Sequence, residues 1–108
     1  MEGLEEAGFT TFIATSGPQA IAELDKDADR FKALVTDIRL GGGPDGWEVA
    51  RHARHAVSTI PVIYCSGDRA SEWSEHGVPN SVMLEKPFAI AQLITALSTL
   101  LNQPTSST

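Results

Sequence analysis

The chain has 108 residues and a mass of 11.5 kDa, which is the size of one domain. Hydrophobic residues make up 42% and charged residues 20% of the sequence, a balance typical of a folded globular protein rather than a disordered one. The formal net charge is −6 and lysine and arginine form no cluster, so we expect no direct binding to nucleic acid or to an anionic membrane.

The cysteine content and the N-terminal sequence narrow the class of protein further. Cys65 is the only cysteine, which excludes an internal disulfide and a cysteine-based zinc site. No apolar run approaches the ~18 residues that a membrane span needs. The N-terminal residues 1–6 are acidic, where a secretory signal would be basic and then apolar. We therefore expect a cytoplasmic domain.

Strand and helix patterns alternate from the N-terminal end onwards. Residues 2–7 look like the last turns of a helix, and Phe9 to Thr15 is rich in phenylalanine, threonine and isoleucine, which favour a strand. Ser16 followed by Gln19 has the spacing of a helix N-cap and its partner. A helix is therefore predicted from Pro18 towards Arg30, with the proline in its first turn.

The middle of the chain contains a second strand and a second helix. Ala33 to Ile38 is a short apolar run with one acidic residue near its end, which predicts a strand buried on both faces. A glycine-rich loop follows at 41–44. Asp45 is a suitable N-cap for the next helix. The apolar face of that helix comprises Trp47, Ala50, Ala53 and Val57.

The last part of the chain continues the alternation. Ile60 to Cys65 predicts another buried strand, and a short, weaker helix follows from Ala70 to His76. Ser81 to Glu85 predicts the last strand. The final helix has the clearest pattern, a continuous apolar stripe made of Ile90, Leu93, Ile94, Leu97, Leu100 and Leu101.

The predicted order of elements is therefore β-α-β-α-β-α-β-α. This alternation predicts an α/β fold, a doubly wound parallel sheet with helices on both faces. In such folds ligands bind beyond the carboxyl ends of the strands, near the point where the strand order reverses. Functional residues should therefore follow the predicted strands.

Three polar residues stand just after, or at the end of, the predicted strands: Asp37, Ser66 and Lys86. Their spacings of 29 and 20 residues each correspond to one strand-helix unit, so the sheet should bring them together at one edge. A carboxylate nucleophile, a hydroxyl donor and a lysine suit phosphoryl transfer, which depends mainly on positioning and charge stabilisation. Each also has a purely structural interpretation, as a loop cap, a turn residue and a solvated edge charge respectively.

Four motifs in order carry a resemblance to a known family. They are residues 36–40 (Thr-Asp-Ile-Arg-Leu), Asp45-Gly46, residues 65–67 (Cys-Ser-Gly) and residues 85–88 (Glu-Lys-Pro-Phe). Together they resemble the receiver domain of bacterial two-component response regulators, which implies a flavodoxin-like fold. The resemblance places a receiver domain at residues 1–103, and we expect residues 104–108 to form a disordered tail.

The resemblance implies a role for each matching residue. Asp37 would be the phosphoacceptor, which takes a phosphoryl group from a histidine kinase or a phosphotransfer protein. Ser66 would be the switch hydroxyl and Lys86 the phosphoryl-binding lysine. Asp37 and the backbone carbonyl of Arg39 would bind Mg²⁺, and the peptide bond between Lys86 and Pro87 would be cis.

Two departures from the family pattern change these expectations. The first strand of the family, with its acidic pair, and most of the first helix are not found before Phe9, so Mg²⁺ binding should be weakened. Met83 stands where receivers usually carry tyrosine or phenylalanine, so any switch should work differently. Because the missing strand would expose two neighbouring strands, we also expect a homodimer.

Three functional hypotheses remain at this point. The first is a single-domain receiver, a phosphorelay signalling module rather than an enzyme, which acts through a downstream protein partner. The second is a degenerate receiver that serves as a protein-interaction or dimerisation module. The third is a flavin- or nucleotide-binding enzyme on the same scaffold, which lacks support because no glycine-rich loop follows a first strand.

Overall fold

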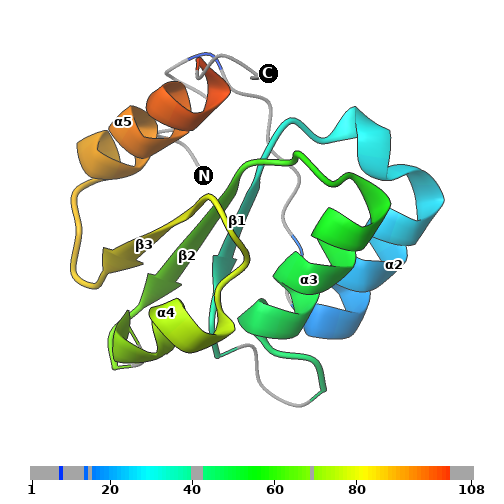
Figure 1. Cartoon of the computed structure of the whole chain (residues 1–108), viewed down its shortest axis with the longest axis horizontal. Coiled ribbons are helices and arrows are strands. Elements are labelled where there is room, and N and C mark those ends of the chain that lie inside the picture. Colours follow the sequence, from blue (N-terminus) through cyan, green and yellow to red (C-terminus); the bar gives the residue numbers. More distant parts are fainter. Residues whose placement is uncertain (1–7, 9–13, 15, 40–42, 69, 103–108) are drawn as a thin grey trace.

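A parallel sheet with helices on both faces forms the centre of the molecule (Figure 1). The computed structural model describes residues 8, 14, 16–39, 43–68 and 70–102. The predicted strand from Phe9 to Thr15 lies outside the described residues except for Ala14, and the predicted tail at 104–108 lies outside them entirely.

Within the described residues the sheet has three strands in the order β1-β2-β3. These are β1 (Leu34–Asp37), β2 (Val62–Ser66) and β3 (Ser81–Glu85), and both pairings are parallel. The arrowheads of all three strands in Figure 1 point towards the same edge of the sheet. The predicted α/β fold with parallel strands is therefore confirmed.

The burial of the strands differs from one to the next. All residues of β2 are buried, as the apolar run predicted. The prediction that β1 is buried on both faces is wrong, because Leu34 and Val35 are only half-buried and Asp37 is exposed. Among the described strands β1 pairs only with β2, and Asp37 lies at the carboxyl end of β1, where the chain leaves the sheet.

The first two helices begin at the caps that the sequence predicts. Helix α2 (Gly17–Asp27) is capped by the Ser16 hydroxyl, which accepts a hydrogen bond from the Gln19 backbone N–H at 3.2 Å, and it ends in a 3₁₀ turn, η1 (Ala28–Arg30). Helix α3 (Gly46–Ala56) is capped by the Asp45 carboxylate, which accepts from the Glu48 backbone N–H at 3.1 Å.

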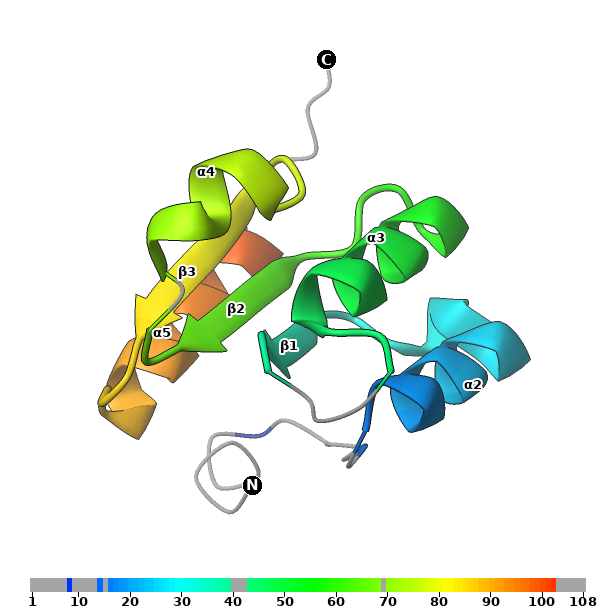
Figure 2. The ribbon, with the colours of Figure 1, turned by 90° about the horizontal axis from the view of Figure 1, so that it is seen from below.

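Helices α2 and α3 lie side by side on one face of the sheet, and α5 (Ile90–Leu101) covers the other (Figures 1 and 2). The core under α3 contains Trp47, Ala50 and Tyr64, with the Trp47 and Tyr64 rings 4.7 Å apart between centroids. The core under α5 contains Ile63 of β2 with Leu93 and Leu97. The apolar stripe predicted for the last helix therefore faces the sheet.

Residue Gly46 fixes how closely α3 approaches the end of β1. A Cβ atom at this position would lie 2.1 Å from the backbone oxygen of Asp37, closer than any side chain tolerates. The backbone N–H of Gly46 also donates to the Ile38 carbonyl at 2.8 Å. Glycine at this position thus allows the helix to support the strand end that presents Asp37.

A short helical segment connects β2 to β3. It consists of a 3₁₀ turn, η2 (Ala70–Glu72), and a single α-helical turn, α4 (Trp73–His76), in place of the one short helix predicted. The Trp73 indole N–H donates to the Ser81 hydroxyl at 2.8 Å, and that hydroxyl donates to the Val78 carbonyl at 2.6 Å. The Tyr64 hydroxyl accepts from the Val78 N–H at 3.0 Å, which anchors the start of β3 to the core.

None of the helices in the described part of the chain is long and apolar enough to cross a membrane.

Candidate functional site

The strand pairing brings the three predicted site residues to one edge of the sheet. Asp37 is the last residue of β1, Ser66 is the last residue of β2, and Lys86 follows β3 directly. The Lys86 backbone N–H donates to the Ser66 carbonyl at 2.9 Å, so the β2–β3 ladder extends one step into this edge.

The side chains of Asp37 and Lys86 form an ion pair. The Lys86 Nζ lies 2.6 Å from Asp37 Oδ1, and about half of each side chain is exposed (48% and 47%). The hydrogen bond to the Asp37 carboxylate is the main cause that raises the pKa of the Lys86 ammonium. Because its ordinary pKa is already near 10.4, Lys86 carries its positive charge at neutral pH.

A small hollow of about 80 Å³ lies at this edge. The Ser66 side chain is buried, with 5% of the residue exposed, and its hydroxyl oxygen accepts a hydrogen bond from the Asp68 N–H at 3.3 Å. The hollow thus combines a hydroxyl with charges of both signs. Its lining residues are Asp37, Arg39, Cys65, Ser66, Gly67, Asp68 and Lys86.

A second ion pair, between Arg39 and Asp68, lines the same hollow. Asp68 was not among the site residues predicted from the sequence. The Arg39 guanidinium donates to both carboxylate oxygens of Asp68, with Nε–Oδ1 at 3.3 Å, Nε–Oδ2 at 3.1 Å and Nη2–Oδ2 at 2.9 Å. Arg39 was expected to contribute only its backbone carbonyl. The signal was in the spacing, because Arg39 stands two residues after Asp37 and Asp68 stands two residues after Ser66.

Cys65 is also part of the hollow, and its raised pKa keeps the thiol protonated at neutral pH. The pKa of this thiol is raised to about 11, mainly by burial and also by the nearby Asp37 carboxylate, while the Lys86 ammonium acts in the opposite direction. Because the thiolate is the nucleophilic form of cysteine, Cys65 is not a candidate nucleophile. This agrees with its place in the strand from Ile60 to Cys65, which the sequence predicts to be buried.

Met83 lies away from the hollow. It is half-buried, pairs in register with Tyr64 of β2, and packs against the core beneath α3. The peptide bond between Lys86 and Pro87 is cis, as the resemblance implies.

The donors suited to a hard cation are few at this edge. Among the residues that the structure describes, no group of three or more His, Cys, Asp or Glu side chains could hold a metal ion. The Asp37 carboxylate and the Arg39 backbone carbonyl are oxygen donors, the type that Mg²⁺ prefers, and Mg²⁺ commonly keeps several water ligands. These residues therefore fit a magnesium ion bound largely through water.

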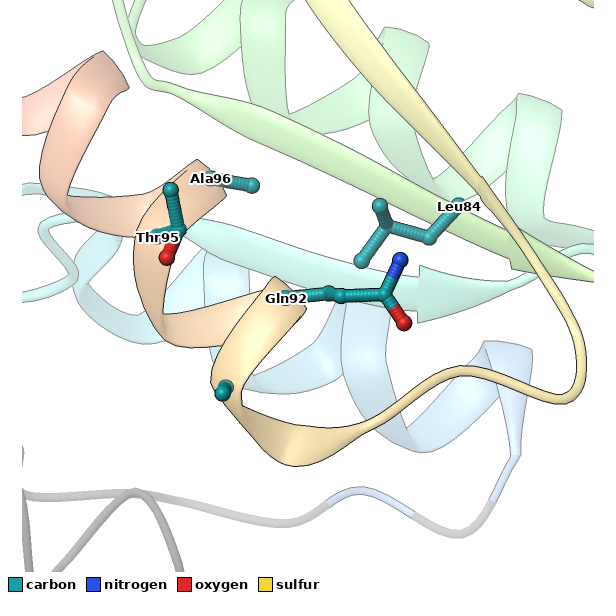
Figure 3. A pocket seen from close by; sticks show the side chains of 5 residues that line it. Leu84, Gln92, Thr95 and Ala96 are labelled. Atoms are coloured by element: carbon teal, nitrogen blue, oxygen red, sulfur yellow. The ribbon is translucent and has the colours of Figure 1, made fainter.

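A larger hollow of about 400 Å³ lies beside α5 and β3 (Figure 3). Its lining residues carry no formal charge, so this hollow does not compete with the strand edge as a site for phosphoryl chemistry. They are Leu84, Ala91, Gln92, Thr95 and Ala96.

The fold and this edge define an α/β domain of the flavodoxin-like type, with an acidic residue, a hydroxyl and a lysine at the carboxyl ends of successive strands. No family model matches the chain. A response regulator receiver protein from Sinorhizobium medicae WSM419 is 50% identical, with a TM-score of 0.90, and the match covers 94% of this chain and 81% of that one. The chain therefore belongs to the response regulator receiver family.

Two further relatives agree with this assignment. The receiver domain of NtrX from Brucella abortus is 25% identical, with a TM-score of 0.79, over 97% of this chain and 87% of that one. The transcriptional regulatory protein CusR from Escherichia coli K12 is 31% identical over 106 residues, which cover 94% of this chain. The chain spans 44% of the length of CusR, so the comparison concerns only part of that regulator.

Proposed function

We propose that this chain is a phosphorylatable receiver domain, in which Asp37 accepts a phosphoryl group from a histidine kinase or a phosphotransfer protein. The observation that carries the proposal is the 2.6 Å contact between Asp37 and Lys86 in a hollow that Ser66 also lines. This edge presents a nucleophilic carboxylate together with the cation and the hydroxyl that a transferred phosphoryl group needs.

The proposed transfer divides the chemistry among these three residues. One Asp37 carboxylate oxygen forms a bond to phosphorus while the bond from phosphorus to the donor's imidazole nitrogen breaks. The electron pair of the broken bond stays on that nitrogen, which takes up a proton. Lys86 neutralises charge on the phosphoryl oxygens as a point charge, and the Ser66 hydroxyl donates a hydrogen bond to one of them.

We propose Mg²⁺ as the cofactor, held by the Asp37 carboxylate and the Arg39 backbone carbonyl. When bound, the ion neutralises part of the charge on the phosphoryl group. We expect weak binding, because the described residues offer only this carboxylate and carbonyl to the ion, apart from Asp68, which is engaged by Arg39. Phosphorylation should therefore saturate only at millimolar Mg²⁺.

We propose that the output is a change in how this domain binds a protein partner in the cytoplasm. The domain would act as a signalling module and not as an enzyme. The net charge of −6 argues against direct contact with nucleic acid. We also propose that the domain forms a homodimer, for which the exposed apolar residues of α5 provide support.

A second candidate is a degenerate receiver that serves only as an interaction or dimerisation module. The observation that favours it is the small number of metal-binding carboxylates among the described residues, since a receiver that cannot bind Mg²⁺ would be phosphorylated poorly.

Labelling with a small phosphodonor separates the two candidates. With acetyl phosphate and millimolar Mg²⁺, we expect one phosphoryl group per chain by intact-protein mass spectrometry. Asp37→Asn should abolish the labelling, and Ser66→Ala should slow it roughly tenfold or more, because it removes a hydrogen-bond donor to the developing charge.

Asp25→Asn is the matched control. Asp25 is an exposed carboxylate on α2 whose Oδ1 lies 2.7 Å from His52 Nε2. It does not line the hollow, so its loss should not affect labelling. If the parent chain is still not labelled when Mg²⁺ is raised from about 1 mM to about 20 mM, the degenerate receiver is favoured instead.

A further inference from the structure

The hollow beside Asp37 contains a second cation besides Lys86. The Arg39 and Asp68 side chains line it together with Asp37, Ser66 and Lys86, and Arg39 contacts both oxygens of the Asp68 carboxylate. Each cation of the hollow is thus paired with a carboxylate, Lys86 with Asp37 and Arg39 with Asp68.

The Arg39–Asp68 pair is easily exchanged for another contact. The two side chains are 67% and 60% exposed, so water screens their attraction and the pair contributes little to stability. The guanidinium fork fits a phosphate group as well as it fits a carboxylate, and a phosphate carries more charge. An incoming phosphoryl group would therefore compete well with Asp68 for Arg39.

Phosphorylation of Asp37 changes the charge balance in the direction that favours this exchange. Before the reaction, two cationic and two anionic side chains face the hollow. An aspartyl phosphate carries roughly one negative charge more than the carboxylate it replaces. The added charge attracts Arg39 and repels Asp68.

We infer that Arg39 is a second phosphoryl-binding side chain of this site, and that Asp68 competes with the phosphoryl group for it. The inference rests on the proposed phosphorylation of Asp37. In the resting domain Asp68 holds the guanidinium, and when a phosphodonor or the phosphoryl group occupies the hollow, Arg39 transfers to it. Asp68 therefore restrains phosphorylation, and Arg39 promotes it.

A double-mutant cycle tests the competition through the rate of Asp37 labelling by acetyl phosphate. We expect Arg39→Gln to slow labelling by about threefold to tenfold and Asp68→Asn to accelerate it by a similar factor, as for an exposed charge-assisted contact. In the double variant the acceleration should be absent, because Asp68 acts by holding Arg39. A purely long-range charge effect would instead leave the acceleration intact in the Arg39→Gln background and would overturn the inference.

Another exposed ion pair provides matched controls. The Arg30 Nη2 lies 2.6 Å from the Glu23 carboxylate on α2 and η1, away from the hollow, so Arg30→Gln and Glu23→Gln make the same changes in net charge. Their labelling rates should equal that of the parent chain. Equal effects of the Arg39 and Arg30 substitutions would also overturn the inference.

A titration with inorganic phosphate separates failure of this inference from failure of the proposed function. Binding is followed by the backbone amide signals of Gly67 and Asp68 in ¹H–¹⁵N spectra, which needs no covalent reaction. Asp68→Asn should tighten phosphate binding severalfold, and Arg39→Gln should weaken it. If the parent chain is not labelled but these changes in phosphate affinity occur, the proposed function fails, and only the competition between Asp68 and a phosphate for Arg39 stands. Unchanged phosphate binding in both variants refutes the inference.

Discussion

The site shows at the scale of single residues how one carboxylate influences its neighbours. The Asp37 carboxylate raises the pKa of the Lys86 ammonium by accepting its hydrogen bond, and it raises the pKa of the Cys65 thiol through charge repulsion of the thiolate. Lys86 has the opposite effect on Cys65. The single cysteine of the chain is therefore an internal probe of the charges in the hollow.

We predict that substitutions at the ion pair shift the alkylation profile of Cys65 in opposite directions. Removing the negative charge with Asp37→Asn should lower the pKa of the thiol from about 11, and removing the positive charge with Lys86→Gln should raise it. At a fixed pH below that value, iodoacetamide should modify Asp37→Asn about two- to fivefold faster than the parent chain, and Lys86→Gln correspondingly more slowly.

The midpoint of the rate-against-pH curve is the decisive measurement, because it depends on the pKa and not on access to the buried thiol. Asp25→Asn, which changes a carboxylate far from Cys65, should leave the midpoint unchanged. Midpoints that move in the same direction for both site variants would contradict the proposed arrangement of charges.

At the scale of elements, Arg54 connects α3 to the turns that precede β2 and β3. Its Nε donates to the Ile60 carbonyl at 2.6 Å, Nη1 to the Pro79 carbonyl at 2.5 Å, and Nη2 to the Asn80 carbonyl at 3.3 Å. Partial burial lowers the pKa of the guanidinium, which nevertheless stays charged at neutral pH. This single side chain thus holds the amino ends of both strands, opposite the candidate site.

We predict that Arg54→Ala lowers the free energy of unfolding by roughly 2–3 kcal/mol, because it leaves carbonyl groups without their charged donor. Arg54→Lys should recover only part of this loss, since an ammonium cannot reach all three carbonyls in the planar geometry of the guanidinium. Urea denaturation followed by tryptophan fluorescence measures both values.

Arg51 provides the comparison on the same helix. Within the described residues its guanidinium makes one hydrogen bond, to the His76 carbonyl at 3.3 Å, so Arg51→Ala should cost less than about 1 kcal/mol. Similar losses for the Arg51 and Arg54 substitutions would show that the three-carbonyl contact has no special role in stability.

At the scale of the whole molecule, the sequence predicted the features that depend on local patterns. The apolar run of β2, the caps Ser16 and Asp45, and the stripe of α5 each follow from spacing along the chain, and the parallel topology follows from their alternation. The edge that gathers Asp37, Ser66 and Lys86 follows from that topology, because parallel strands end on the same side.

Features that depend on contacts between distant segments could not be predicted in the same way. The half-buried state of Val35 depends on what other parts of the chain pack against β1, which no pattern inside the strand encodes. The Arg39–Asp68 contact joins two loops 29 residues apart. The spacing of its members after Asp37 and Ser66 places both at the same edge of the sheet, but only the packed structure shows that they form an ion pair beside Asp37.

The proposed homodimer concerns the face of the molecule that carries α5. Ile90 and Leu101 of this helix are 40% and 38% exposed, and Ile94 and Leu100 are half-buried. Under the same helix, Val35 of β1 is also only half-buried. Apolar surface of this kind is stabilised when a second copy covers it, at about 25 cal/mol per Å² removed from water.

We predict a dimer by multi-angle light scattering at micromolar concentrations, with a melting temperature that rises with protein concentration because association stabilises the folded state. The double substitution Ile90→Lys with Leu101→Lys should shift the mass to that of a monomer, since two buried charges per chain would be introduced into the contact. Glu75→Lys on α4, an exposed position outside α5, is the control and should leave the mass unchanged. A monomeric mass for the parent chain at every concentration, with a constant melting temperature, would contradict the dimer, and a dimer that survives the double substitution would place its interface elsewhere than on α5.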